Sequence, residues 1–256
     1  MEYLKINRKS WDERAHVHYE STFYDVESFK QGKSSLNQIE VSQLGDIKDK
    51  SLLHLQCHFG LDTLSLARLG ANVTGVDLST VAIEKAKALS NELGIKSTFV
   101  ASDVYEFGRT NTRKFDIVFS SYGVLCWLPD LKAWAKVISE SLAPGGEFHL
   151  VEFHAFCDLM NGYSYFYSEI PDIEEEQTYT ENCAGTESTV VTWPHPLSEV
   201  INALILAGLS IEHFEEYEYS PYPSCEGLEF IESKGYSLKH QGHHVPLLYA
   251  IKAIKK

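Results

Sequence analysis

SLLHLQCHFGLDTLSLARLGANVTGVDLS, which spans residues 51–79, decides the fold class of this chain. It contains two short apolar runs, Ser51–Leu55 and Asn72–Asp77, and between them a segment, Asp62–Leu69, whose apolar residues recur at helical spacing. Two neighbouring parallel strands need a crossover connection, and a helix is the usual one. The stretch therefore predicts a strand–helix–strand unit of a parallel sheet.

The alternation continues to about residue 153. Further apolar runs and helical spacing predict three strands and two helices: Ser97–Ala101, Phe115–Phe119 and Glu147–Phe153 as strands, and Ser79–Leu93 and Leu131–Leu142 as helices. Ser79 can cap the first of these helices, and Gly94 lies at its end, where a left-handed residue is favoured. The run Pro144-Gly145-Gly146 predicts a sharp turn before the fifth strand.

The segments on either side of this core, 51–153, have a different texture. Residues 1–50 are polar and aromatic and predict short helices that form a lid. Residues 154–195 interrupt the alternation and predict an inserted cap, because their many aromatic side chains call for burial. Residues 196–256 return to it with a helix and two strands, Ser198–Ala207, Ser210–Glu218 and Leu247–Ile254. We expect one α/β domain with a doubly wound, Rossmann-like, seven-stranded and mostly parallel sheet, helices on both faces, N-terminal helices and a cap after strand five.

Charge and composition narrow the function. With 22 basic and 36 acidic residues among 256, the formal net charge is −14. Such a field repels phosphate backbones, so we expect no nucleic-acid partner. The longest apolar runs, such as Ala203–Gly208, are too short to span a bilayer, and the N-terminus lacks the apolar core of a signal peptide. We expect a cytoplasmic protein with no membrane partner; the sequence assigns no oligomeric state.

Cysteine and histidine spacing gives no metal site. The five cysteines, Cys57, Cys126, Cys157, Cys183 and Cys225, have no CxxC spacing, which is typical of reduced thiols rather than a disulfide framework. His240, His243 and His244 have no matched acid or cysteine nearby. We therefore expect no metal.

The candidate ligand site lies beyond the carboxyl ends of the strands, where open α/β sheets bind their ligands. The residues expected there are Leu55, Gln56, Cys57 and Gly60 after strand one, Asp77, Leu78 and Ser79 after strand two, Asp103 and Val104 after strand three, and Ser121 and Tyr122 after strand four. Asp77 can accept both hydroxyls of an adenosine ribose. Asp103 can accept the adenine amino group while the Val104 backbone donates to a ring nitrogen. The structural alternative for both acids is a turn or a helix cap.

The first loop separates nucleoside cofactors from one another. Dinucleotides need G-x-G-x-x-G so that backbone amides can approach a pyrophosphate. Here Gly60 is the one glycine of the loop, and Gln56 and His58 stand where glycines would be wanted. S-adenosylmethionine has no phosphate, only a short zwitterionic amino-acid tail, so this loop favours it over a nicotinamide dinucleotide. Gln56 and His58 either contact the cofactor or form hydrogen bonds within the loop.

At this point the chain resembles a known family. Leu52–Gly60 with Gly75–Ser79 resembles motif I and the following acidic motif of the class I S-adenosylmethionine-dependent methyltransferases. Phe115–Phe119 with Leu128–Leu131 resembles motif IV, and Leu142–Phe148 resembles the turn before strand five. Over residues 50–153 the resemblance implies this fold, S-adenosylmethionine as cofactor, and methyl transfer to a small-molecule acceptor.

One departure from the family pattern concerns motif I. The usual motif has an acid followed by glycine, cysteine and glycine, whereas this chain has His54, Gln56, Cys57 and His58. The run His-Leu-Gln-Cys-His-Phe-Gly resembles a bacterial subgroup of the family. The missing acid usually helps to order the amino group of the cofactor, and the expected substitute is Gln56 or an N-terminal aromatic residue.

The acceptor side offers a base and aromatic walls. His154, at the end of strand five, is the first candidate base because a histidine titrates near neutrality; anchoring the cap is the alternative. His16 and His18 are weaker candidates. Aromatic residues expected to line the acceptor pocket are Trp11, Tyr24, Tyr122 and Trp127.

Two further readings concern the acceptor and the activity. The acidic run Asp172–Glu176 could attract a cationic acceptor or form a solvated face. Because motif I is altered, the alternative to an enzyme is a regulatory protein that binds S-adenosylmethionine or S-adenosylhomocysteine without catalysis.

Overall fold

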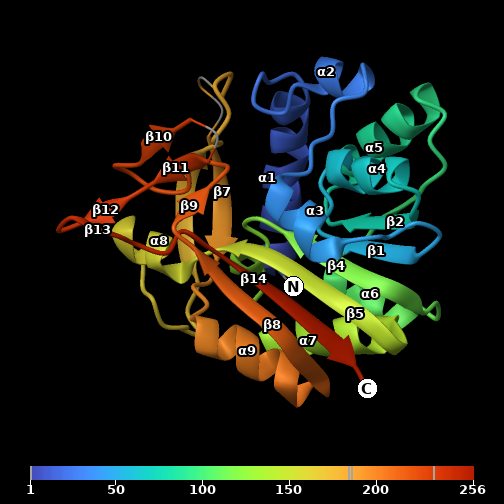
Figure 1. The fold of residues 1–256 in the computed structure, drawn as a ribbon. Helices are drawn as coiled ribbons and strands as arrows, with labels where there is room; N and C mark the ends of the chain where they lie inside the picture. Colours follow the sequence, from blue (N-terminus) through green and yellow to red (C-terminus); the bar gives the residue numbers. More distant parts are fainter. Residues whose placement is uncertain (1, 184, 186, 233) are drawn as a thin grey trace.

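The computed structural model describes residues 2–183, 185, 187–232 and 234–256 (Figure 1). Its centre is a seven-stranded sheet in the order β3-β2-β1-β4-β5-β14-β8. The strands are β3 (Thr98–Ala101), β2 (Asn72–Asp77), β1 (Ser51–Leu55), β4 (Phe115–Ser121), β5 (Leu142–Phe153), β14 (Leu248–Lys255) and β8 (Leu209–Tyr217). The first five run parallel, and β14 is antiparallel to both its neighbours. The predicted seven-stranded, mostly parallel sheet is confirmed.

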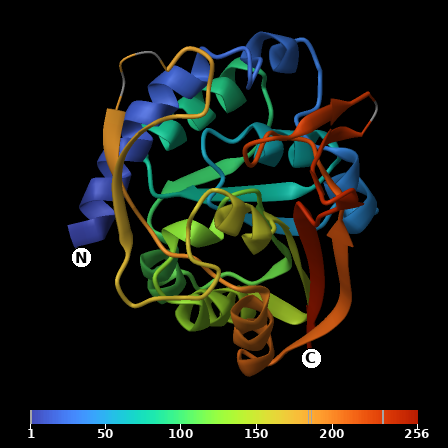
Figure 2. The same ribbon diagram turned by 90° about the vertical axis from the view of Figure 1, so that its left-hand side faces the viewer.

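Helices cover both faces of the sheet because its central strands β1, β2 and β4 are buried on both sides, as in other buried parallel sheets (Figure 2). One face packs against α6 (Val104–Thr110), α7 (Leu131–Ser141) and α9 (Leu197–Leu206), and the other against α4 (Leu61–Arg68) and α5 (Thr80–Glu92). Trp134 of α7 is completely buried against Phe148 of β5. Ser79 caps α5 through Ala82 N, and Gly94 follows it with a φ of 63°, as predicted. The helix α6 was not predicted.

Two details of the predicted elements are wrong. The first 50 residues begin with one long helix, α1 (Glu2–Tyr19), before the short helices α2 (Val26–Lys30) and α3 (Gln38–Leu44). The turn expected at Pro144–Gly146 is an irregularity inside β5, where the register moves from Phe115↔Leu142 to Ile117↔Glu147. Extra residues on one strand are accommodated as a bulge without ending the ladder, and Gly145 supplies the left-handed φ of 74°.

The cap and α1 form one unit. The cap contains α8 (Ala155–Met160) and a hairpin of β6 (Asp172–Gln177) and β7 (Glu187–Thr192). The Asn7 side chain donates to Val191 O (2.8 Å) and accepts from Val191 N (2.9 Å), as a neighbouring strand would. Arg14 forms an ion pair with Glu176 (2.7 Å), and this side of α1 lies along β7 in Figure 1.

Aromatic burial, the reason given for a cap from the sequence, applies to part of this segment. Trp193 is buried and packs edge-on against Tyr3 of α1 (5.2 Å), whereas Phe166 is 70% exposed. Polar contacts between α1 and the hairpin add to this packing. A polar run such as Asp172–Glu176 can form β6 because its partner strand satisfies the backbone.

A second insertion between β8 and β14 was not predicted. It holds a three-stranded sheet in the order β10-β11-β9 and a β12–β13 hairpin: β9 (Tyr219–Ser220), β10 (Glu229–Ile231), β11 (Gly235–Ser237), β12 (Lys239–His240) and β13 (His243–His244). Because β5 and β8 both run antiparallel to β14, both insertions leave the sheet at the same end. That end carries the carboxyl termini of the parallel strands.

His240, His243 and His244 lie exposed on the β12–β13 hairpin. Within the described ranges, no three His, Cys, Asp or Glu residues are grouped so that they could hold a metal ion. Among all the residues that the structure describes, no helix is long and apolar enough to cross a membrane.

Candidate functional site

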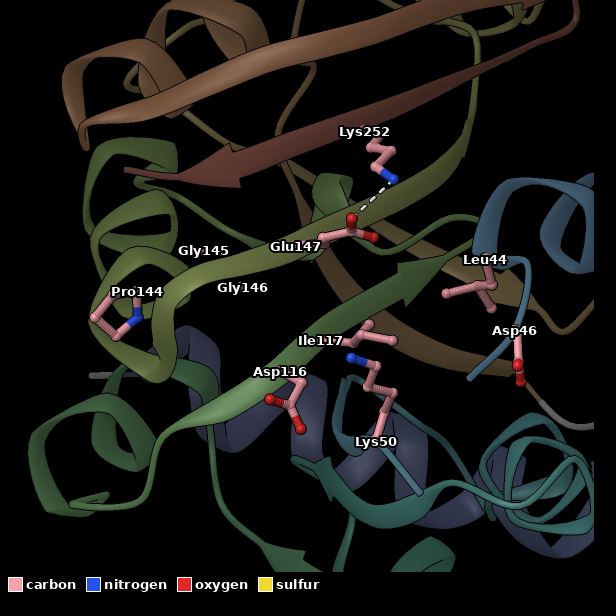
Figure 3. Close-up of a pocket in the computed structure, with 10 residues that line it drawn as sticks. All are labelled: Leu44, Asp46, Lys50, Asp116, Ile117, Pro144, Gly145, Gly146, Glu147 and Lys252. Carbon is pink, nitrogen blue, oxygen red and sulfur yellow. Dashed lines mark ion pairs between the residues drawn. The ribbon is translucent and has the colours of Figure 1, made fainter. Parts of the chain in front are cut away.

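A cavity of about 450 Å³ lies at the opposite end of the sheet from the predicted site (Figure 3). Its walls come from the segment before β1, the start of β4, the bulge of β5 and Lys252 of β14. Lys252 forms an ion pair there with Glu147 (2.9 Å). Ligands of open α/β sheets bind at the carboxyl ends of the strands, so this cavity is not the candidate site.

The loop after β1 keeps the shape of a glycine-rich loop without its glycines. Gln56 and His58 have left-handed φ angles of 58° and 50°, which cost about 1 kcal/mol each for a residue with a side chain. Cys57 N donates to Val76 O (3.0 Å), which ties the loop to β2. A Cβ on Gly60 would lie 2.7 Å from Phe99 Cε1, so this position cannot dispense with glycine.

Asp77 anchors that loop from the end of β2. Its carboxylate accepts from His58 N (2.7 Å) and Ser79 N (2.8 Å). Burial raises the pKa of Asp77 to about 6, and these backbone hydrogen bonds oppose the rise. A carboxylate has about four acceptor positions, so two remain for a ligand. The loop bond and the free acceptor positions both fit the predicted ribose contact.

A second acid, Asp12 of α1, lies beside Asp77 and was not predicted. It accepts from Ser79 Oγ (2.6 Å) and Val81 N (3.1 Å) at the start of α5. Leu78, between Asp77 and Ser79, is half-buried, so this turn stays accessible from the site. The contact joins the lid helix to the ribose end of the site.

At the end of β3, Asp103 acts in part as a helix cap, which is the structural alternative to an adenine contact. One carboxylate oxygen caps α6 through Glu106 N (3.0 Å). The side chains of Val104 and Leu55 are buried in the core, so only their backbone atoms can reach a ligand. Tyr3 of α1 approaches this end: burial, with Asp103 and Asp130 nearby, raises its pKa to about 12.

The end of β4 is held by a buried acid from β5. Glu152 accepts from the backbone N–H groups of Gly123, Val124 (2.8 Å) and Leu125 (3.1 Å). The Gln56 side chain donates to Val124 O (2.7 Å), so the loops after β1 and β4 are joined. These bonds position Ser121 and Tyr122, whose φ of 49° turns the chain away from the strand.

Three of the predicted aromatic residues meet above these loops. Trp11 packs edge-on against Trp127 of the short helix η1 (Leu125–Trp127), with ring centroids 5.2 Å apart, and against His58 at 5.3 Å. Tyr24 stacks on His18 at 5.2 Å. Tyr122 belongs to a different group, because its ring packs against Phe153 and Tyr222.

His18 and His58 form a buried pair that the sequence did not indicate, since 40 positions separate them. His18 Nδ1 and His58 Nε2 lie 2.9 Å apart, and His18 Nε2 bonds to Thr178 of the cap. Burial and the nearby Arg14 lower the pKa of His18 to about 3 and that of His58 well below its usual value. Both rings are therefore neutral at pH 7. His16 is exposed on the outer side of α1.

We expect His18→Gln to weaken the acid sensitivity of the fold. A pKa lowered from 6.5 to about 3 contributes stability above pH 6.5 that is lost as the pH falls toward 3. Between pH 7.5 and pH 5 this loss is about 2 kcal/mol for wild type, and the variant should be spared it. Denaturant unfolding at both pH values measures the difference. An equal loss in both proteins would contradict the expectation; the exposed His16→Gln is the matched control.

His154 is engaged by the protein through both ring nitrogens. Nδ1 accepts from Phe156 N (3.0 Å) and so caps α8, which leaves the proton on Nε2, 2.9 Å from Glu216 Oε1 of β8. A general base needs a nitrogen lone pair that is free to accept a proton. His154 therefore takes the cap-anchoring alternative.

Several buried polar atoms at this end of the sheet have no hydrogen-bond partner among the described residues. They include Gln56 Oε1, His58 Nδ1, Tyr122 OH, Glu40 Oε2, Thr180 Oγ1 and Tyr3 OH. Buried polar atoms are nearly always satisfied in folded proteins. A polar ligand bound at the strand ends could satisfy these unpaired atoms. They therefore fit a nucleoside with an amino-acid tail.

The cap encloses a smaller cavity of about 170 Å³ next to Trp127. The acidic run predicted to attract a cation contributes to it: its walls include Asp158, Asp172, Glu174, Glu176, Trp127 and Trp193. Burial and the nearby Glu152 raise the pKa of Asp158 to about 6. An anionic ligand would be repelled from this cavity.

Comparison with known proteins gives a consistent picture of the core. Residues 52–146 match a protein-family model described as a methyltransferase domain. A ubiquinone biosynthesis O-methyltransferase from Serratia proteamaculans (strain 568) is 25% identical over 145 residues, which are 55% of this chain and 57% of that protein. The chain thus spans little more than half the length of this curated relative.

Two solved structures share the fold across nearly the whole chain. An S-adenosylmethionine-dependent methyltransferase from Clostridium acetobutylicum superposes with a TM-score of 0.61 and 15% identity, covering 96% of this chain and 99% of that one. Another from Mesorhizobium loti gives 0.57 and 20%, covering 88% and 100%. At such identities the likeness establishes the fold.

Proposed function

The chain carries a methyltransferase domain within a class I methyltransferase fold, and from this premise we propose that it is an S-adenosylmethionine-dependent methyltransferase acting on a small molecule. The observation that carries the proposal is Asp77, a buried carboxylate that anchors the first loop and keeps acceptor positions free. A pyrophosphate would face this carboxylate in a loop whose left-handed positions carry side chains. A sulfonium nucleoside meets neither obstacle.

Residues at successive strand ends would each hold a different part of the cofactor. Asp77 accepts the ribose hydroxyls, and Asp103 with the Val104 backbone meets the adenine. Gly60 keeps the first loop close to the sheet, and Gln56 presents its unpaired Oε1 from the same loop. When bound, the cofactor supplies a methyl group on a sulfonium centre that is open to in-line displacement.

The residues of this chain position the reactants and exclude water. Trp11 and Trp127 close over the loop, and the contacts of Asn7 and Arg14 with the cap hold α1 in place above it. A dry, aligned site contributes most of the rate in a displacement that needs no covalent enzyme intermediate.

The identity of the methyl acceptor does not follow from the similarity to the relatives. Apart from Tyr122 and Trp127, the surfaces that would contact it come from α1–α3, the cap and the second insertion, all outside residues 52–146. The acidic lining of the cap cavity favours a neutral or cationic molecule.

Calorimetry with S-adenosylmethionine, followed by detection of S-adenosylhomocysteine after incubation with a metabolite extract, tests the proposal. We expect binding in the micromolar range, typical of cofactor sites, and product release that depends on the extract. Absence of binding at millimolar cofactor would refute the proposal. Binding without product from any extract would support the regulatory alternative instead.

A further inference from the structure

The chain lacks the motif I acid, yet a cationic amino group must be held if the proposed cofactor binds. His54 occupies that position and cannot take over the task. Its Nδ1 bonds to Thr63 Oγ1 (2.8 Å), its ring packs on Phe119, and burial lowers its pKa to about 3. A neutral ring turned into the core leaves the amino group without a counterion.

The sheet order gives the direction of the amino-acid tail. Asp103 follows β3 and Asp77 ends β2, so the adenine and ribose subsites lie on the β3 side of β1. The tail leaves the ribose at the side opposite to the base. It must therefore cross β1 toward β4, where the loop after β1 meets Ser121.

Two carboxylates lie at that end, one half-buried (Asp62) and one completely buried (Glu40). Asp62 is the second residue of α4, which begins directly after Gly60, and the side chains of Ser35 and Ser121 lie near it. Glu40 of α3 is completely buried, and one of its oxygens has no partner among the described residues. No ion pair among the described residues includes either acid.

Asp62 and Glu40 differ in how far their carboxylate oxygens are already engaged by the protein. Glu40 Oε1 accepts from Asn37 N (3.3 Å) and Asn37 Nδ2 (3.2 Å) in a capping box, and its other oxygen faces the Tyr122 hydroxyl. Asp62 is half-buried and lies in the first turn of α4, the helix into which the loop leads. A buried carboxylate without a cation is costly, and a ligand ammonium group would relieve that cost.

We propose that Asp62 replaces the missing motif I acid and binds the ammonium group of the cofactor's amino-acid tail. The inference rests on the proposed function and assigns a role to a residue outside the motif I position. Glu40 acts behind it, as a second negative charge that strengthens the attraction for a cation.

The pH dependence follows from the groups that face Asp62. Burial, followed by the charge of Glu40, raises the pKa of Asp62 to about 7. The other titratable neighbours are Glu40 itself and four groups that stay neutral below pH 7.5: Cys57, Tyr24, Tyr122 and Tyr222. Attraction for an ammonium group should therefore grow as the pH rises from 5.5 to 7.5.

The test compares two ligands on the full-length protein. S-adenosylmethionine carries the ammonium group, and 5′-methylthioadenosine has the same nucleoside without the amino-acid tail. Calorimetry should give a 10- to 100-fold weaker affinity of Asp62→Asn for S-adenosylmethionine at pH 7.5. The affinity for methylthioadenosine should change less than about twofold, since Asp77 is untouched.

The ratio of the two affinities isolates Asp62 from Asp77, whose titration affects both ligands alike. In wild type the preference for S-adenosylmethionine should rise between pH 5.5 and 7.5, and in Asp62→Asn it should stay flat. Decarboxylated S-adenosylmethionine, which keeps the ammonium group, should be as sensitive to Asp62→Asn as the parent compound.

Four results would overturn the assignment. An equal loss for both ligands in Asp62→Asn would reveal a general loop defect. A selective loss in Glu40→Gln but not in Asp62→Asn would transfer the role to Glu40. Failure of wild type to bind either ligand would refute the proposed function as well, whereas tight wild-type binding with an unaffected Asp62→Asn would refute this inference alone.

Discussion

Asp77→Ala is expected to weaken S-adenosylmethionine binding by at least about 100-fold, or about 2.7 kcal/mol. The substitution removes the acceptors for the ribose hydroxyls, and charged hydrogen bonds contribute about 1.5–3 kcal/mol each. It also releases the His58 and Ser79 amides, so the loop loses its anchor to β2. Calorimetry at pH 7.5, above the raised pKa of about 6, measures the loss with the carboxylate ionised in wild type.

S-adenosylmethionine and 5′-methylthioadenosine, the two ligands used for Asp62, also distinguish the role of Asp77 from that of Asp62. Asp77→Ala should weaken S-adenosylmethionine and 5′-methylthioadenosine to the same extent, because both contain the ribose. Asp12→Ala is the control: its carboxylate contacts Ser79 Oγ and Val81 N rather than the loop. We expect it to cost less than about tenfold, the loss of hydrogen bonds at a helix start. Unchanged binding in Asp77→Ala would remove the main support for the cofactor.

Gly60→Ala is expected to destabilise the protein by about 3 kcal/mol and to abolish cofactor binding. The new Cβ would lie 2.7 and 2.8 Å from Phe99 Cε1 and Cζ and 3.1 Å from Ala86 Cβ. Phe99 is buried, so it has little space to retreat, and overpacking of this kind costs about 1–3 kcal/mol. The φ of 80° adds about 1 kcal/mol for any residue with a side chain. The melting temperature should fall by roughly 6–12 °C.

Gly94→Ala separates the two causes. Gly94 also has a left-handed φ, 63°, but a Cβ there would meet no atom within 4 Å. We expect a loss of about 1 kcal/mol from backbone strain alone and unchanged cofactor affinity. Equal destabilisation in the two variants would mean that Phe99 moves aside freely and that the close packing under the loop has no consequence.

Local patterns predicted the parts of the site that are near one another in sequence. Asp77 is the last residue of its strand, and the chain between Gly60 and Asp77 is one helix and one strand, so both ends meet at the same edge. The same reasoning gave Asp103 its place, although the structure also uses it as the cap of α6. The cap-anchoring alternative for His154 rests partly on a local contact, the cap of α8 through Phe156 N, and partly on Glu216 of β8, 62 positions away, which no local pattern indicates.

The sequence by itself determined the sheet, the five parallel strands and the line of residues at their carboxyl ends. This was possible because hydrophobic periodicity is a local property and parallel strands place their ends together. Only the tertiary structure brought Asp62 beside Glu40, paired His18 with His58, and bound α1 to the cap through Asn7 and Val191. These contacts join segments 22 to 184 residues apart, and their partners are selected by burial and hydrogen-bond satisfaction in three dimensions, which leave no periodic trace in the chain.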